Sequence, residues 1–229
     1  MNLDNYDNYV FDLYGTLIDI NTDERAAKTW KKWLKILDRE KIKHPDYIRF
    51  RRDFFELDKL YRAEATQKTG SKYPEIEILN VYRELFDDYG NKPVVDEKLS
   101  ELSYAFRACS REYYRLYDGV PEFLKKLRSS GKKVYILSNA QASYTLPEIL
   151  HFGLDKMVDD YIISSDCGYM KPDGAFFEVL IGRHSLERSR TVMIGDSSFS
   201  DGGVAKNCGT DFIHLAGENS SKIFYIKNL

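Results

Sequence analysis

Residues 9–17 read YVFDLYGTL, an apolar run that stops abruptly at a carboxylate. The segment 9–13 is short, continuous and rich in aromatic and branched side chains, which predicts a strand buried on both faces. Strands of this kind belong to parallel sheets that helices cover on both sides. We therefore expect Asp12 to stand at the carboxyl end of such a strand.

Strands of the same kind recur from Asp118 onward, each separated from the next by a helical segment. The expected strands are 134–137, 161–164, 191–194 and 211–215. The expected helices are 121–128, 144–151, 175–181 and 204–207. This alternation predicts an α/β fold with a doubly wound parallel sheet of the Rossmann type.

Polar side chains follow the predicted strands, either directly or in the loops beyond them, where open parallel sheets bind their ligands. They are Asp12, Tyr14, Thr16, Ser138, Asn139, Lys171, Asp196 and Asp201. Taken singly, residues of these types are ordinary turn formers, helix caps or loop charges. Their joint arrival at one edge of one sheet predicts a functional site.

The first strand is separated from the repeating units by about 100 residues, against about 30 for a whole strand-helix-strand unit. The intervening segment has helical periodicity, as in Trp30, Trp33, Leu34 and Leu37. A second stripe runs from Leu99 to Tyr113, and Pro74 is expected to start a further helix. We predict an α/β core of residues 1–19 and 116–229 and an all-helical domain of residues 20–115. Its aromatic stripes are expected to form the bundle core, with a substrate-contacting face as the alternative.

Four segments in order, FDLYGTL, ILSNA, GYMKPDGAFF and IGDSSFSD, resemble the motifs of the haloacid dehalogenase superfamily of hydrolases. The insertion is similar to the helical cap that this superfamily places after its first motif. The resemblance implies that Asp12 is the nucleophile and that Lys171 neutralises it. It also implies that Thr16, Ser138 and the backbone around Asn139 hold the transferring group. Asp196 would bind Mg²⁺ directly, and Asp201 would bind it through water or support it from outside.

The chemistry of the acids supports a metal independently of the family. A carboxylate with a reference pKa of about 3.9 is ionised at pH 7 and attacks without a base, provided that a cation offsets the repulsion from a phosphate. One lysine cannot offset three carboxylates and a phosphate dianion, whereas such oxygen ligands suit Mg²⁺. The sequence therefore predicts Mg²⁺ as the cofactor.

Tyr14 departs from the pattern of the phosphatases in this superfamily, which usually read D-x-D-G-T with the second aspartate as general acid. A tyrosine hydroxyl, with a reference pKa of about 10, is a poor acid at neutral pH. Tyr14 is expected either near the substrate or as an aromatic residue of the core, and in both cases its backbone carbonyl is a candidate metal ligand.

DLYGTL also resembles the 2-haloacid dehalogenases, which use the same nucleophile without a metal and hold the substrate carboxylate with a cap arginine. Arg49, Arg51 and Arg52 are the candidates here, against the simpler interpretation of a solvated face. Because Asp196 and Asp201 keep a phosphatase-like spacing, we favour a Mg²⁺-dependent phosphatase. A dehalogenase is the main alternative, and a weakly catalytic ligand-binding protein is the third.

Two glycines, Gly202 and Gly203, follow Asp201 in a segment expected to be helical. Each costs about 1 kcal/mol relative to alanine in a helix. Helix propensity therefore opposes a helix that starts at Asp201, whereas Asp196 directly follows a predicted strand.

The composition restricts the partners of the protein. Lysine and arginine number 34 and aspartate and glutamate 36, a net charge of −2, which does not favour nucleic acid. No apolar stretch reaches the roughly 18 residues of a membrane span, and the start has no secretory leader pattern. Three dispersed cysteines suggest no disulfide framework. We expect a cytoplasmic protein acting on a small phosphorylated metabolite.

Overall fold

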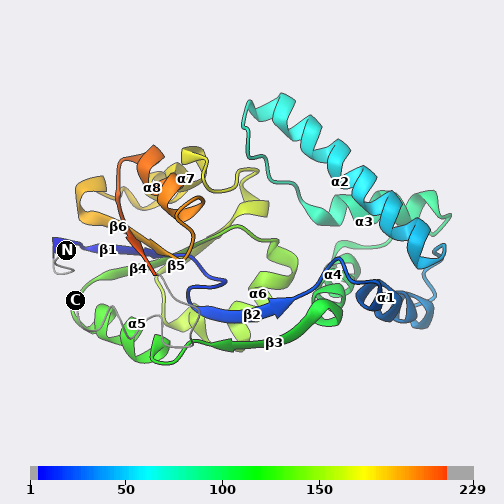
Figure 1. The fold of residues 1–229 in the computed structure, drawn as a ribbon, viewed down its shortest axis with the longest axis horizontal. Helices are drawn as coiled ribbons and strands as arrows, with labels where there is room; N and C mark the ends of the chain where they lie inside the picture. Colours follow the sequence, from blue (N-terminus) through cyan, green and yellow to red (C-terminus); the bar gives the residue numbers. More distant parts are fainter. Residues whose placement is uncertain (1–4, 216–229) are drawn as a thin grey trace.

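The computed structural model describes residues 5–215, in which five parallel strands form one sheet (Figure 1). Their order across the sheet is β5 (Asp160–Ile163), β4 (Lys133–Ser138), β1 (Asn8–Phe11), β6 (Thr191–Gly195) and β7 (Asp211–His214). Every residue of the central strand β1 is buried. Phe11 pairs with Ile136 of β4 and Ile194 of β6, so the three strands end close together. The predicted parallel sheet is confirmed.

Helices cover both faces of the sheet because successive side chains of each strand point to opposite faces. Phe11 packs in one hydrophobic cluster with Phe123, whereas its neighbour Val10 packs in another with Phe176. The first face carries α5 (Val120–Ser129) and α6 (Ala142–His151), and the second carries α7 (Gly174–His184) and α8 (Asp201–Cys208). Short 3₁₀ helices span Leu154–Lys156, Ser164–Asp166 and Arg188–Arg190.

Four more helices form a group beside the carboxyl edge of the sheet (Figure 1). They are α1 (Ala27–Arg39), α2 (Tyr47–Thr69), α3 (Ile78–Asp88) and α4 (Asp96–Ser110). We call residues 27–110 the helical insertion. It encloses its own cluster of buried side chains, including Trp30, Trp33, Phe50 and Phe86. The expected interior role of the aromatic stripe of α1 is thus confirmed.

Two strands join the helical insertion to the sheet, where the sequence predicted only helix from residue 20 to 115. β2 (Ile18–Thr22) and β3 (Arg111–Leu116) pair as an antiparallel ribbon. The expected helical stripe therefore ends at Ser110, and Tyr113 lies on β3 with 45% of its surface exposed. The two paired segments lie about 90 residues apart in the chain, and Asp19 faces Arg115 across the ribbon.

Pro74 does not start a helix, contrary to the prediction. The helix α3 begins at Ile78, and the Glu77 side chain caps it by accepting from the Leu79 backbone N–H. Before it, Tyr73 accepts a hydrogen bond from Met170, at 3.0 Å, through backbone atoms. The chain there is bound to the loop that carries Lys171, which brings the helical insertion to the carboxyl edge of the sheet.

The outer ends of the expected core, residues 1–4 and 216–229, lie outside the described residues. Within residues 5–215, no helix combines the length and the apolar character that a bilayer crossing requires. All three cysteines are free, as expected.

Candidate active site

Asp12 follows β1 directly, and its backbone N–H donates to the carbonyl oxygen of Ile194 at 2.9 Å. This bond continues the sheet by one residue and fixes the backbone position from which the Asp12 side chain projects. The chain then turns at Gly15, whose φ is 84°. A β-carbon at this position would collide with the carboxylate of Asp196, so only glycine allows the two loops to come so close. The motif residues Asp12 and Asp196 are thereby brought together.

Lys171 lies at the centre of the site, almost fully buried. Its Nζ donates to Oδ1 of Asp12 at 2.6 Å and to the carbonyl oxygen of Leu137 at 2.8 Å. The same nitrogen lies 2.7 Å from Oδ1 of Asp201. Burial opposes the charge of the ammonium, but the two carboxylates outweigh this effect and raise the pKa of Lys171. One ammonium therefore holds two of the three predicted acids in place.

The three predicted acids form one cluster. Asp12, Asp196 and Asp201 each offer a carboxylate oxygen, and these oxygens lie within 4.8 Å of one another. Asp201 also accepts a hydrogen bond from the Ser197 backbone N–H at 3.0 Å, so its buried position is well supported despite the two glycines that follow it. Burial raises the pKa of Asp12 to about 6, although Lys171 lowers it; Asp201 and Asp196 add to the rise. A further cation among these acids would offset their repulsion.

The hydroxyl and amide residues are arranged around Asp12 in different ways. Thr16 is fully buried and donates to Oδ2 of Asp12 at 3.3 Å. Asn139 accepts from the Lys171 backbone N–H at 2.8 Å and donates to the Lys171 carbonyl at 3.0 Å. Its side chain thus positions the loop of the lysine, a role that the sequence did not reveal. Ser138 Oγ is buried and has no hydrogen-bond partner among residues 5–215.

Tyr14 points into the contact between the sheet and the helical insertion. Its hydroxyl donates to Oε2 of Glu148 at 2.5 Å and lies 3.2 Å from Oγ1 of Thr145. Burial, reinforced by the negative charge of Glu148, raises the pKa of Tyr14 well above 10.0. The proton of this hydroxyl is therefore committed to Glu148, and the side chain is unsuited to protonate a leaving group.

Glu148 and Arg107 are residues of this region that sequence reasoning missed. Glu148, on α6, is fully buried; its Oε1 lies 3.4 Å from Nε of Arg107 on α4 and 3.1 Å from Nη1 of Arg111 on β3. The guanidinium of Arg107 lies over the rings of Tyr14 and Tyr144, 4.8 and 4.7 Å from their centres. The signal available in the sequence was a lone acid within an otherwise uncharged helix.

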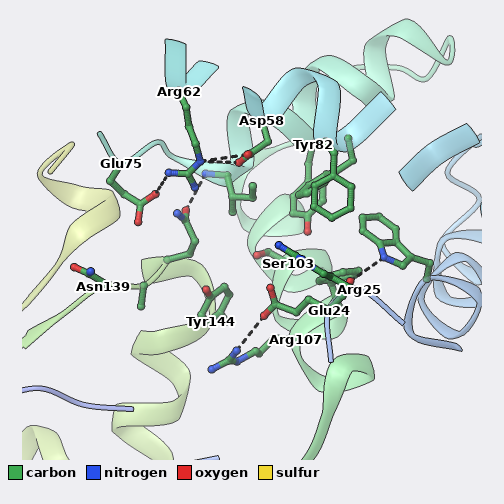
Figure 2. A pocket seen from close by; sticks show the side chains of 17 residues that line it. Glu24, Arg25, Asp58, Arg62, Glu75, Tyr82, Ser103, Arg107, Asn139 and Tyr144 are labelled. Carbon is green, nitrogen blue, oxygen red and sulfur yellow. Dashed lines mark hydrogen bonds and ion pairs between the residues drawn. The ribbon is translucent and has the colours of Figure 1, made fainter. Parts of the chain in front are cut away.

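A cavity of about 330 Å³ lies between the helical insertion and the loop after β4 (Figure 2). Asn139, Ala140 and Gln141 form its wall on the side of the sheet. Its charged lining residues are Glu24, Arg25, Asp58, Arg62, Glu75 and Arg107.

The arginines proposed for a dehalogenase, Arg49, Arg51 and Arg52, are absent from the cavity lining. Arg49 and Arg52 instead pair with Asp53, at 3.5 and 2.7 Å, on the exposed side of α2. For Arg49 and Arg52 the structure supports the solvated-face interpretation. Arg51 is half-buried, and its guanidinium lies 5.8 Å from the ring centre of Phe55.

Comparisons with known proteins give the family and the fold of the chain. The family model described as haloacid dehalogenase-like hydrolase matches residues 6–209. Phosphoserine phosphatase of Thermus thermophilus is 27% identical over 121 residues, 53% of this chain and 47% of that relative, so the chain matches about half its length. Glyceraldehyde 3-phosphate phosphatase of Pyrococcus abyssi is 26% identical over 199 residues, 87% of this chain and 76% of that protein.

Solved structures share the fold. A HAD phosphatase from Thermococcus onnurineus superposes with a TM-score of 0.57 at 21% identity, covering 93% of this chain and 87% of that one. L-2-haloacid dehalogenase from Xanthobacter autotrophicus gives a TM-score of 0.53 at 19% identity, covering 98% and 84%. By its sheet, its motifs and the match over 6–209, the chain belongs to the haloacid dehalogenase-like hydrolases.

Proposed function

We propose that the protein is a Mg²⁺-dependent phosphatase of small phosphorylated metabolites, with Asp12 as its nucleophile. The observation that carries this proposal is the cluster of Asp12, Asp196 and Asp201 around Lys171, with 2.6 Å between Lys171 Nζ and Asp12 Oδ1. Phosphatase names among the relatives support the same reaction class.

The donor set fits Mg²⁺. Lys171 pairs with only two of the three clustered carboxylates, Asp12 and Asp201. Carboxylate and carbonyl oxygens are the ligands that Mg²⁺, a hard cation, prefers. Asp12, Asp196 and the backbone carbonyl of Tyr14 would hold the ion directly. Asp201 would bind the ion through water or support it from outside, as the resemblance of its motif implies. The ion, when bound, would stabilise negative charge on the transferring phosphoryl group.

In the proposed reaction, a carboxylate oxygen of Asp12 forms a bond to phosphorus while the bond to the ester oxygen breaks. The electron pair leaves with the ester oxygen, and water then hydrolyses the aspartyl phosphate to inorganic phosphate and free Asp12. Lys171 and Thr16 hold the nucleophile. The unpartnered Ser138 hydroxyl supports a ligand here, because an orphaned buried hydroxyl costs about 1–3 kcal/mol that a phosphoryl oxygen would recover.

Dehalogenation stays the second candidate, since a haloacid dehalogenase shares the fold and Tyr14 occupies the acid position. The arrangement of the arginines on α2 gives it no support, because none of Arg49, Arg51 and Arg52 lines the cavity. A weakly catalytic ligand-binding protein is the third.

One screen distinguishes the three candidates. Purified protein is incubated with phosphate esters and, separately, with 2-chloropropionate, each with Mg²⁺ and with a chelator. Phosphate release that stops on chelation supports the proposal. Halide release that survives chelation would identify a dehalogenase, and no release from either substrate would favour the ligand-binding candidate. A cytoplasmic location stays a prediction from the sequence.

A further inference from the structure

The cavity beside the active site has an aromatic wall. Asn139 belongs both to this wall and to the loop that binds Lys171, so the cavity borders the nucleophile's immediate surroundings. The rings that line it come mostly from the helical insertion, and they are Trp30, Phe54, Phe55, Tyr82, Phe106 and Tyr144. They support one another: the ring centres of Trp30 and Phe106 are 4.7 Å apart, and those of Trp30 and Phe54 are 5.3 Å apart. Phe55, 40% exposed, offers a free ring face to a planar aromatic guest, whereas Trp30, Phe54, Tyr82 and Phe106 are at most 8% exposed and support the wall from behind.

The charges around the cavity are balanced rather than acidic. Arg62 lies 3.2 Å from both Asp58 and Glu75, and Arg107 lies 3.1 Å from Glu24 (Figure 2). The third cavity arginine, Arg25, has no ion pair among residues 5–215. An aromatic wall can also receive a quaternary ammonium. Here three arginines and three acids line the cavity, so the lining carries no net negative charge to attract a cation, and the cavity favours a neutral ring.

Tyr14 independently restricts which leaving groups can depart, because it supplies no proton to the departing oxygen. Because the Tyr14 proton is held by Glu148 at 2.5 Å, the departing oxygen leaves without a proton from this position. A phenolic oxygen has a reference pKa of about 10, whereas that of water, which alkyl alcohols resemble, is about 15.7. A phenolate therefore departs far more readily than an alkoxide.

We propose that the substrate is a phosphate monoester of an aromatic alcohol and that its ring occupies this cavity. This inference rests on the proposed phosphatase function and specifies its substrate class. Asp12 forms the bond to phosphorus, the bond between phosphorus and the aryl oxygen breaks, and the phenolate takes the electron pair and later a proton from water.

Binding tests the inference without turnover. The chain has two tryptophans, and Trp30 lines the cavity, so its fluorescence reports on occupancy. The full-length Asp12→Asn protein with Mg²⁺ is titrated with phenyl phosphate, methyl phosphate and phosphocholine. We expect phenyl phosphate to bind at least about tenfold more tightly than the other two, a difference of about 1.4 kcal/mol.

Substitutions in the cavity wall test whether the ring of phenyl phosphate binds there. Phe106→Ala should weaken the binding of phenyl phosphate about tenfold and leave that of methyl phosphate within about twofold. Because Phe106 is buried, Phe55→Ala, whose ring is 40% exposed, provides a second variant with less risk to folding. Phe152→Ala is the matched control, since Phe152 packs on Tyr114 outside the cavity and should leave both ligands unaffected.

Equal binding of phenyl and methyl phosphate would overturn the inference, and so would tightest binding of phosphocholine. Phosphate release by the unmodified protein from all esters without aromatic preference would also overturn it while leaving the phosphatase proposal intact. Selective binding of phenyl phosphate by a protein that hydrolyses no ester would support the aromatic cavity and refute the phosphatase.

Discussion

Tyr14 occupies the position of the general acid in related phosphatases, and its hydroxyl can be removed by substitution. Because its proton is donated to Glu148 and its pKa is raised well above 10.0, we expect Tyr14→Phe to change kcat/KM by less than about threefold. Removing a working general acid would instead cost about 10²- to 10⁴-fold. The measurement is kcat/KM for an alkyl and an aryl phosphate in both proteins. A loss of 100-fold confined to the alkyl ester would show that Tyr14 does protonate the leaving group.

Asp196 carries a separate prediction at the same scale. Asp196→Ala removes a proposed direct ligand from a site with few protein oxygens, so the Mg²⁺ concentration for half-maximal activity should rise at least about tenfold. Thermal unfolding should change little. Asp88→Ala, which removes an exposed carboxylate at the end of α3, is the control. A Mg²⁺ curve unchanged by the Asp196 substitution would exclude this residue from the metal site.

The carboxylate cluster could be predicted from sequence because Asp12 and Asp196 directly follow recognisable strands and Asp201 lies a few residues beyond the second. The direction of the Tyr14 side chain could not, since its partner Glu148 lies 134 residues further along the chain. Asn139 shows the same limit. Its amide binds the backbone of Lys171, 32 residues away, and nothing in the local sequence specifies that pairing.

At the scale of elements, the glycines of α8 mark a close approach. A β-carbon on Gly203 would lie 2.6 Å from Cβ of Pro172, the residue after Lys171. Gly203→Ala should therefore lower the free energy of unfolding by about 1–3 kcal/mol despite the better helix propensity of alanine. Gly182 in α7 has open space at this position, so Gly182→Ala should raise it by up to about 1 kcal/mol.

Denaturant unfolding of the two glycine variants and the unmodified protein checks this pair. Equal stabilisation by both substitutions would mean that α8 does not pack tightly against the Lys171 loop. A reduced activity of Gly203→Ala alone, in folded protein, would agree with a displaced lysine.

The ribbon of β2 and β3 could not be predicted from the sequence. Residues 111–116 read REYYRL, and the helical periodicity of the sequence before them continues to Tyr113 without a helix stop signal. Pairing with β2 outweighs that local pattern, and the segments that pair are far apart in the chain. The short apolar strands of the sheet were predictable because their burial on both faces leaves a continuous pattern.

At the scale of the molecule, Glu148 ties the sheet domain to the helical insertion through Arg107 and Arg111. Breaking a buried ion pair leaves charges without partners, so Glu148→Gln should lower the free energy of unfolding by about 3–5 kcal/mol. Glu112→Gln, which breaks the exposed pair with Lys28, should cost no more than about 1 kcal/mol. Urea denaturation measures both. Equal costs would show that the buried cluster does not hold the two parts together.

The central claim is that Asp12 becomes phosphorylated during turnover. Protein with Mg²⁺ is mixed with acetyl phosphate, quenched in acid within the first turnover, digested and analysed by mass spectrometry. The account predicts that the peptide containing Asp12 gains one phosphoryl group, and that the modification disappears in Asp12→Asn and on chelation of the metal. Phosphate release without any modified Asp12 peptide, or by Asp12→Asn at an undiminished rate, would contradict it.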